Sequence, residues 1–212
     1  MAHKASITDA LREGFEVTKK NANSVLVMFV ALQVIIFILT DLMGMPFLNI
    51  LMIPVVLFMQ MALYKSFKST YTKFDVNHIL SLKDAHLKPT LWKLFITNLI
   101  YVILLVLLFL LLVIPGIIFM VYWYVFSVVV MDQGLSGMEA LKKSREMIRG
   151  NWWRTFGLVL ISALIMGVIS SIVSSITGGS SFAGGLLMAI ISAAMSVYFG
   201  YVAIAYYFGL RR

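Results

Sequence analysis

The chain of 212 residues contains no cysteine and few charged residues. Without cysteine it has no disulfide, no thiolate nucleophile and no thiolate metal ligand. Charged residues make up 12% of the chain and hydrophobic residues 61%, whereas soluble domains average about 25% and about 45–50%. Apolar runs of about 20 residues, enough to cross a hydrocarbon core of about 30 Å, recur along the sequence. The composition predicts a single membrane domain over residues 1–212, with no separate soluble domain.

Groups that carry enzymatic chemistry are also scarce. No ionisable residue lies at the centre of a predicted span, and no glycine-rich loop followed by lysine and serine or threonine indicates a nucleotide site. His78 and His86 flank Asp84, but their spacing is not a recognised metal-ligand spacing. The sequence therefore predicts no enzyme, no cofactor and no metal. Three amides within predicted spans indicate interhelical hydrogen bonds or, alternatively, a polar substrate path: Gln33, Gln60 and Asn98.

The apolar runs predict six transmembrane helices. Pro115-Gly116 ends one run and the next begins at once, which predicts a helical hairpin with almost no loop. The composition of residues 177–185, "TGGSSFAGG", predicts a flexible loop. The six predicted spans cover residues 24–43, 47–65, 91–113, 117–131, 153–176 and 186–210.

Polar stretches predict three amphipathic helices that lie along the membrane interface. They cover residues 5–20, about 77–87 and about 136–149. The predicted fold class is therefore all-α: a polytopic integral membrane protein with six transmembrane helices and three interfacial helices. The predicted apolar face of the first interfacial helix contains Ile7, Ala10, Leu11, Phe15 and Thr18, and that of the third contains Leu135, Met138, Leu141 and Ile148.

The positive charges predict the orientation of the chain. With six spans, all 17 lysines and arginines fall on the side of the membrane that holds both termini, and the other side carries Asp41. The positive-inside rule then places both termini in the cytoplasm of a multi-pass protein of the cytoplasmic membrane. The net charge of +8 is mostly a topology signal and does not indicate nucleic-acid binding. Specific binding of acidic lipid or of a partner is the alternative explanation.

The sequence also contains a repeat. "ALREGFEVTKKN" at residues 10–21 aligns without a gap on "ALKKSREMIRGN" at residues 140–151, and "WKLF" at 92–95 aligns on "WRTF" at 153–156. One unit is an amphipathic helix, a break and two spans. The pattern predicts a three-fold internal repeat with units at about 5–65, 77–131 and 135–210.

Three segments resemble one known family. They are "IPGII" at residues 114–118, Asp132-Gln133-Gly134, and "EALKKSREMIRGNWWRTFGL" at residues 139–158. The chain resembles a group of uncharacterised bacterial and archaeal polytopic membrane proteins, and it is similar to the membrane domain of glycerophosphoryl diester phosphodiesterases. The resemblance implies the six-span plan and no defined activity.

Basic, aromatic and small residues form the candidate sites. The basic residues of the interfacial helices and the tryptophans at the membrane boundary are predicted to contact anionic lipid or a partner. An aromatic triplet in the fourth span predicts a groove for lipid or peptide, or else core packing. Small residues every four positions predict tight packing of the last two spans, or a homo-oligomer interface. The contact residues are Lys142, Lys143, Arg145, Arg149, Trp152, Trp153, Lys19 and Lys20; the groove residues are Tyr122, Trp123 and Tyr124; the packing residues are Gly167, Ser171, Ser196 and Gly200.

These observations predict a non-enzymatic membrane protein that contacts anionic lipid or a partner through its cytoplasmic interfacial helices. The alternative is a transporter or a protein that moves lipid or peptide, because internal repeats are typical of transporters. The predicted partners are membrane lipids and either a second copy of the chain or another membrane protein.

Overall fold

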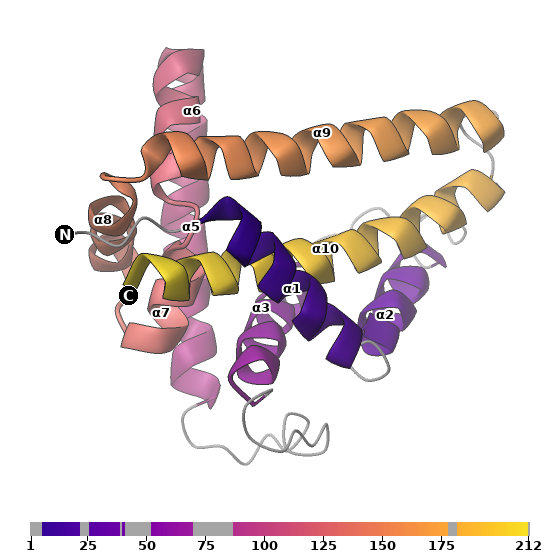
Figure 1. The fold of residues 1–212 in the computed structure, drawn as a ribbon, viewed down its shortest axis with the longest axis horizontal. Helices are drawn as coiled ribbons and strands as arrows, with labels where there is room; N and C mark the ends of the chain where they lie inside the picture. The colour runs from indigo at the N-terminus through magenta and orange to yellow at the C-terminus, as the bar shows by residue number, and fades with distance from the viewer. Residues whose placement is uncertain are drawn as a thin grey trace.

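The computed structural model describes residues 6–21, 26–38, 40, 52–69, 87–177 and 182–211. All regular structure in these residues is helical, which confirms the all-α prediction. The predicted middle interfacial helix lies almost entirely outside them, as do His78, His86 and Asp84. The helices, labelled as in Figure 1, are α1 (Ile7–Asn21), α2 (Val27–Phe37), α3 (Met52–Ser69), α5 (Leu87–Leu111), α6 (Val113–Tyr122), α7 (Phe126–Gln133), α8 (Gly137–Ile148), α9 (Trp152–Thr177) and α10 (Phe182–Arg211).

Four described stretches are long and apolar enough to cross a membrane, which is compatible with a multi-pass membrane protein. They are Pro89–Leu111, Val113–Gln133, Trp152–Thr177 and Phe182–Arg211. The 11 residues of α2 span only about 17 Å at about 1.5 Å per residue. Six spans and the three-unit repeat therefore stay predictions.

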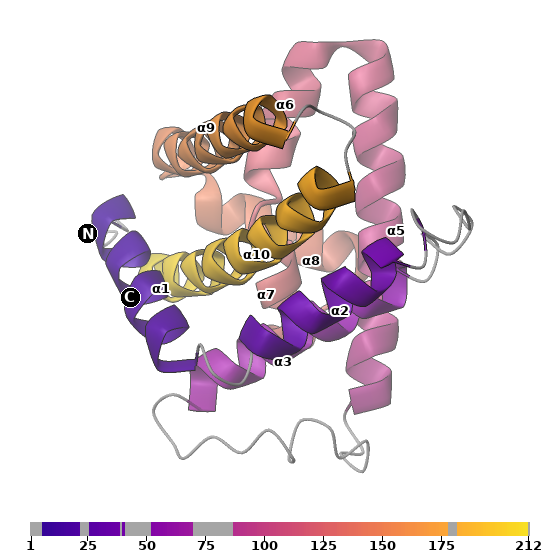
Figure 2. The same cartoon turned by 90° about the vertical axis from the view of Figure 1, so that its right-hand side faces the viewer.

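Two helical hairpins organise the described chain. The first joins α5 to α6, and the second joins α9 to α10 (Figure 1). The α9–α10 pair runs across the α5–α6 pair, as the turned view in Figure 2 also shows. Helix α10 lies at the centre, because α1, α2, α3 and α9 all pack on it.

The α5–α6 turn lies at Leu112, three residues before the predicted Pro115-Gly116 break. Leu112 is extended, with φ −160° and ψ 130°. Pro115 is the third residue of α6, where the missing N–H of proline costs nothing because the first turn has no carbonyl partner for it. Gly116 brings the two helices close together: a Cβ at this position would lie 2.8 Å from the ring of Phe109.

Both ends of the loop predicted at residues 177–185 are helical in the structure. Helix α9 includes Thr177, and α10 begins at Phe182. Gly185 is part of α10, and a Cβ there would lie 2.6 Å from the ring of Phe37 in α2. This glycine therefore serves the close approach of two helices rather than flexibility.

Asp132 at the end of α7 joins three helices. Its carboxylate accepts hydrogen bonds from Tyr64 of α3 at 2.6 Å and from Tyr207 of α10 at 2.7 Å, and it pairs with Arg211. Gln133 donates to the Tyr207 hydroxyl at 3.0 Å. The side chain of Asp132 is only 8% exposed, so these donors replace the water that a buried carboxylate loses.

Candidate functional site

Helix α8 is held in place by polar contacts from α5. Gly134 and Gly137 both have positive φ, 67° and 58°, which lets the chain turn sharply between α7 and α8. Lys93 donates to the Gly134 carbonyl at 2.7 Å. The Thr97 hydroxyl accepts from the N–H of Gly137 at 2.8 Å and so caps the start of α8. Ala140, Leu141, Ser144 and Ile148 are buried, so α8 packs on the protein along one face.

The predicted fourth span is broken in the middle. Helix α6 ends at Tyr122 and α7 begins at Phe126, and both Trp123 and Val125 have ψ near 10°. The N–H of Phe126 donates to the carbonyl of Trp123 at 3.1 Å, so it does not pair with the Tyr122 carbonyl as it would in a continuous helix. The Ser144 hydroxyl of α8 donates to that carbonyl at 2.9 Å. Helix α8 thus satisfies a backbone group that the break leaves open.

The junction between α8 and α9 forms a hollow of about 400 Å³. Trp152 stacks on Phe156 with ring centroids 5.3 Å apart and meets Trp153 edge to face at 4.8 Å. Trp153 is 77% exposed. The hollow lies at the N-terminal end of α9, where the helix dipole is positive. The N–H groups of Arg154 and Thr155 donate to the Asn151 carbonyl, so those of Trp152 and Trp153 are the first-turn N–H groups without a carbonyl partner in the helix. The lining residues are Tyr122, Arg149, Gly150, Asn151, Trp152, Trp153 and Arg154; this set is called the α8–α9 hollow below.

The other basic residues of α8 have different surroundings. Lys142 is exposed. Lys143 pairs with Glu146 at 3.2 Å on the same helix. The guanidinium of Arg145 lies 5.6 Å from the ring centroids of both Phe119 and Tyr122, a cation–π arrangement that holds it against α6.

Lys19 and Lys20 do not join the α8–α9 hollow. Both are exposed on the last turn of α1. The first turn of α1 approaches α9, because a Cβ at Gly157 would lie 3.7 Å from Ile7. Lys19 is about 18 Å further along α1 at about 1.5 Å per residue. The predicted contact residues therefore form two separate basic regions in the described chain.

The three predicted groove residues face three different surroundings. Tyr122 lines the α8–α9 hollow. Trp123 is buried in a small cluster with Phe126 and Leu141. Tyr124 lines a separate cavity between α2, α3, α7 and α10. Because the helix is broken at residues 123–125, these three neighbouring side chains face different parts of the protein.

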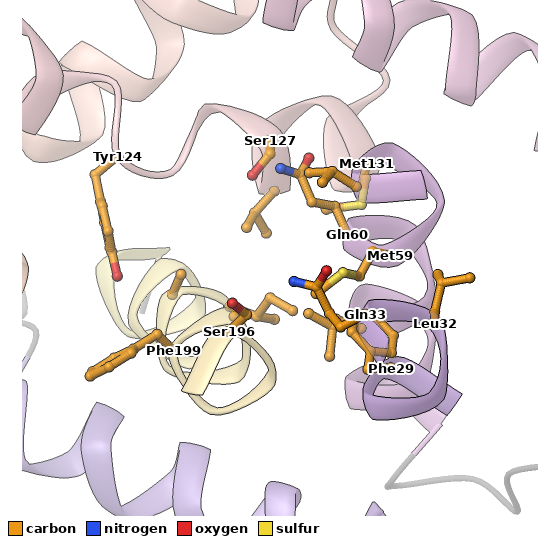
Figure 3. Close-up of a pocket in the computed structure, with 16 residues that line it drawn as sticks. Phe29, Leu32, Gln33, Met59, Gln60, Tyr124, Ser127, Met131, Ser196 and Phe199 are labelled. Carbon is orange, nitrogen blue, oxygen red and sulfur yellow. The ribbon is translucent and has the colours of Figure 1, made fainter. Parts of the chain in front are cut away.

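This second cavity has a volume of about 350 Å³ and is mainly apolar. Figure 3 shows the amide nitrogens of Gln33 and Gln60 and the hydroxyls of Ser127 and Ser196 around its interior, whereas the Oε1 atom of Gln60 is buried. Two of the three amides identified in the sequence therefore line the same cavity. The third, Asn98, donates to the carbonyl of Leu94 in its own helix at 2.9 Å. The lining residues are Phe29, Leu32, Gln33, Val56, Met59, Gln60, Leu63, Tyr124, Ser127, Val128, Met131, Ser196, Phe199, Gly200, Ala203 and Ile204; this set is called the inner cavity below.

The predicted packing residues do not meet between α9 and α10. Gly167 and Ser171 are exposed on α9, and a Cβ at Gly167 would meet nothing within 4 Å. Ser196 lines the inner cavity. Gly200 packs on α3 instead, since a Cβ there would lie 2.5 Å from Leu63.

Within residues 6–21, 26–38, 40, 52–69, 87–177 and 182–211, no group of three or more histidines and carboxylates forms a metal site. The sequence identified Gln33 and Gln60 individually but did not predict that they line one cavity. It also did not predict the role of Ser144. The available signal was the spacing of this serine, which places it on the same face of α8 as the apolar residues.

In the part of the chain that the structure describes, these features define an all-helical arrangement with four stretches of membrane-crossing length and composition. Residues 81–208, more than half of the chain, match the family described as Domain of unknown function (DUF7847), and the chain belongs to that family. No curated protein and no solved structure matches it. The similarity to the membrane domain of glycerophosphoryl diester phosphodiesterases stays a prediction.

Proposed function

We propose that the chain is a non-enzymatic integral membrane protein that binds anionic lipid headgroups at the α8–α9 hollow, on the cytoplasmic side of the membrane. The observation that carries this proposal is the gathering of Arg149, Trp152 and Trp153 around one hollow at the start of a helix. Arginine and backbone N–H groups bind phosphate, and indole rings favour the headgroup region. Lys142 extends the positive surface along α8.

The test compares two aligned basic residues. Arg149 and Lys19 occupy the same position in the sequence repeat, and both are exposed, but only Arg149 lines the hollow. Native mass spectrometry in mild detergent would measure adducts of phosphatidylglycerol and of phosphatidylcholine with the same acyl chains. Because a basic residue near an anionic surface contributes about 1 kcal/mol, Arg149→Gln is expected to weaken phosphatidylglycerol binding about fivefold.

The control variant Lys19→Gln is expected to bind phosphatidylglycerol as the wild type does. Phosphatidylcholine adducts are expected to be weaker than phosphatidylglycerol adducts in every variant. Equal effects of Arg149→Gln and Lys19→Gln would show that general charge, and not the hollow, attracts the lipid. The hollow would then be better explained as a contact for a second copy or another membrane protein.

A second candidate function is movement of lipid or peptide across the membrane. The break in the fourth predicted span favours it, because discontinuous helices line the binding sites of many transporters. Proteoliposomes with fluorescent lipid in both leaflets would test it. A lipid-moving protein is expected to make nearly all of the probe accessible to an external quencher, whereas an inactive protein leaves about half protected, as empty vesicles do.

A further inference from the structure

Four polar side chains around the inner cavity have no hydrogen-bond partner. Figure 3 shows the amide nitrogens of Gln33 and Gln60 and the hydroxyls of Ser127 and Ser196 around the cavity interior. None of these four side chains makes a hydrogen bond within the part of the chain that the structure describes. Polar groups inside folded proteins are usually paired with protein, with water or with a bound molecule, so the cavity offers several unused donors.

The amides favour a ligand that accepts hydrogen bonds. An amide nitrogen only donates, whereas a hydroxyl can donate or accept. The Oε1 atom of Gln60 is buried against the protein, so the nitrogen is the atom of this amide that the cavity presents to a ligand. A carbonyl oxygen has two lone pairs and can accept from two donors at once. The cavity therefore fits a ligand that carries a carbonyl group.

The rest of the lining is uncharged and mainly apolar. None of the described lining residues is an acid, a lysine, an arginine or a histidine, so a charged ligand would lose its hydration without gaining an opposite charge. Most of the lining residues are apolar, among them Phe29, Met59 and Phe199. The cavity volume of about 350 Å³ lies within the range of about 300–1,000 Å³ typical of ligand sites. The lining therefore fits a carbonyl group attached to a hydrocarbon chain.

One end of the cavity adjoins the charged cluster at Asp132. Met131 lines the cavity and directly precedes Asp132. Gln60 lies about one helical turn before Tyr64, which donates to Asp132. Val56, which also lines the cavity, is 39% exposed, so part of the lining reaches the outer surface of α3. In acyl lipids the ester groups likewise lie between a polar headgroup and hydrocarbon chains, so an ester matches the surroundings of the cavity.

We propose that the inner cavity binds the acyl ester of a membrane lipid, with the ester carbonyl accepting hydrogen bonds from the amide nitrogens of Gln33 and Gln60. The acyl chain packs on the aromatic and methionine side chains of the lining. This site is distinct from the α8–α9 hollow, because the two sets of lining residues share no member.

Three single-chain probes test the proposal on the purified full chain in mild detergent. They are methyl dodecanoate, pentadecane, which has the same number of non-hydrogen atoms but no acceptor, and dodecanoate, which is charged. Native mass spectrometry would measure the one-to-one adduct of each probe. We expect methyl dodecanoate to bind at least about fivefold more tightly than pentadecane, as one hydrogen bond predicts, and more tightly than dodecanoate. The infrared band of its carbonyl is expected to move to lower wavenumber on binding, because a hydrogen bond weakens the C=O bond.

Variants locate the binding. Gln33→Met and Gln60→Met keep the approximate size of the side chain and remove the donor. Each is expected to weaken the binding of methyl dodecanoate about fivefold and to leave pentadecane unchanged. Gln60→Met also removes the buried oxygen that has no partner, so this variant is expected to fold. Asn98→Leu is the matched control, because Asn98 bonds to the Leu94 carbonyl of its own helix, outside the cavity; it is expected to bind all three probes as the wild type does.

Equal binding of methyl dodecanoate and pentadecane to the wild type would overturn the proposal, as would tighter binding of dodecanoate or the absence of any adduct. An ester preference that survives in both glutamine variants would overturn the role of the amides. If neither variant folds, the ranking of the three probes and the carbonyl band on the wild type decide.

A second pair of ligands distinguishes two natural sources of the ester. Didodecanoylglycerol and didodecanoyl phosphatidylcholine carry the same acyl esters, and only the second has a phosphate. Both are expected to form adducts that Gln33→Met and Gln60→Met weaken, because the lining carries no charge; an adduct of only one identifies the class of lipid. The single-chain probes carry no phosphate, so their failure leaves the lipid-headgroup proposal untouched, and Arg149→Gln is expected to bind methyl dodecanoate as the wild type does.

Discussion

Helices α1 and α8 share one sequence pattern but are fixed to the protein by different forces. Ala10 of α1 and the aligned Ala140 of α8 are both buried, and so are the aligned Gly14 and Ser144. Helix α1 packs mainly on α10, whereas α8 packs on α5 and α7. The shared pattern therefore determines which face of the helix is buried, and residues outside the pattern determine what covers that face.

The contacts of the two helices differ in chemistry. Helix α1 meets α10 by close approach, since a Cβ at Gly14 would lie 2.5 Å from a methyl group of Val202. Helix α8 is held by hydrogen bonds, in which Ser144 donates to the Tyr122 carbonyl and Thr97 accepts from the N–H of Gly137. Close approach dominates at α1, with one long hydrogen bond from the Tyr198 hydroxyl to the Leu11 carbonyl at 3.4 Å, whereas α8 adds these shorter hydrogen bonds to a buried apolar face.

The largest expected effect is that of Gly14→Ala. The new Cβ overlaps with Val202, including main-chain atoms 3.1 Å away, and overpacking costs about 1–3 kcal/mol. We expect a loss of about 2 kcal/mol in the free energy of unfolding, measured by circular dichroism in mixed SDS micelles. Trypsin is also expected to cleave faster at Arg12 and Lys19, because α1 detaches from α10.

Gly150→Ala is the matched control for this variant. A Cβ at Gly150 would meet nothing within 4 Å, so the variant is expected to leave stability within about 0.5 kcal/mol of the wild type. If Gly14→Ala were as stable as Gly150→Ala, close approach would not be what fixes α1.

The sequence predicted the local features of these helices well. The predicted stretches 5–20 and 136–149 agree closely with Ile7–Asn21 and Gly137–Ile148, because hydrophobic periodicity reports the buried face directly. The predicted apolar face of the first helix is only partly packed on the protein: Phe15 is 58% exposed, and Val17, which the prediction did not include, is buried. The packed face follows Ala10, Gly14 and Val17, and a glycine is easily overlooked because it adds little hydrophobicity to a pattern.

The tertiary features could not be predicted from the sequence. The break at residues 123–125 falls in "MVYWYVFS", which contains no proline or glycine, and the carbonyl that it leaves open accepts a hydrogen bond from Ser144 of another helix. Asp132-Gln133-Gly134 was visible as a family signature, but the donors to Asp132 come from α3 and α10. Gln33 and Gln60 were visible singly, and only the packing of α2 on α10 and α3 on α10 brings them together.

Ser144→Ala tests the polar attachment of α8. The variant leaves the partly buried carbonyl of Tyr122 without its donor, which is expected to cost about 1 kcal/mol in the free energy of unfolding. The same SDS titration measures it. Ser144→Thr keeps the hydroxyl and is the rescue control, expected to retain more stability than Ser144→Ala. Equal losses in both variants would indicate that the size of the residue, not its hydrogen bond, matters at this position.

The smallest expected effect is the difference in the free energy of unfolding between substitutions at Arg145 and at Phe15, two residues that the repeat aligns. Arg145 lies over the rings of Phe119 and Tyr122, and an exposed cation–π contact contributes about 0.5–1 kcal/mol. Arg145→Gln is therefore expected to lower the free energy of unfolding by about 0.5 kcal/mol. Phe15→Gln is expected to change it less, because Phe15 has most of its surface exposed. The two variants are compared in one SDS titration, and Arg145→Lys, which keeps the charge, is expected to fall between Arg145→Gln and the wild type.

A larger loss for Phe15→Gln would mean that the exposed face of α1 is covered in the folded protein, by a second copy or another membrane protein. The attachment of α1 would then resemble that of α8 more than the contacts within one chain indicate.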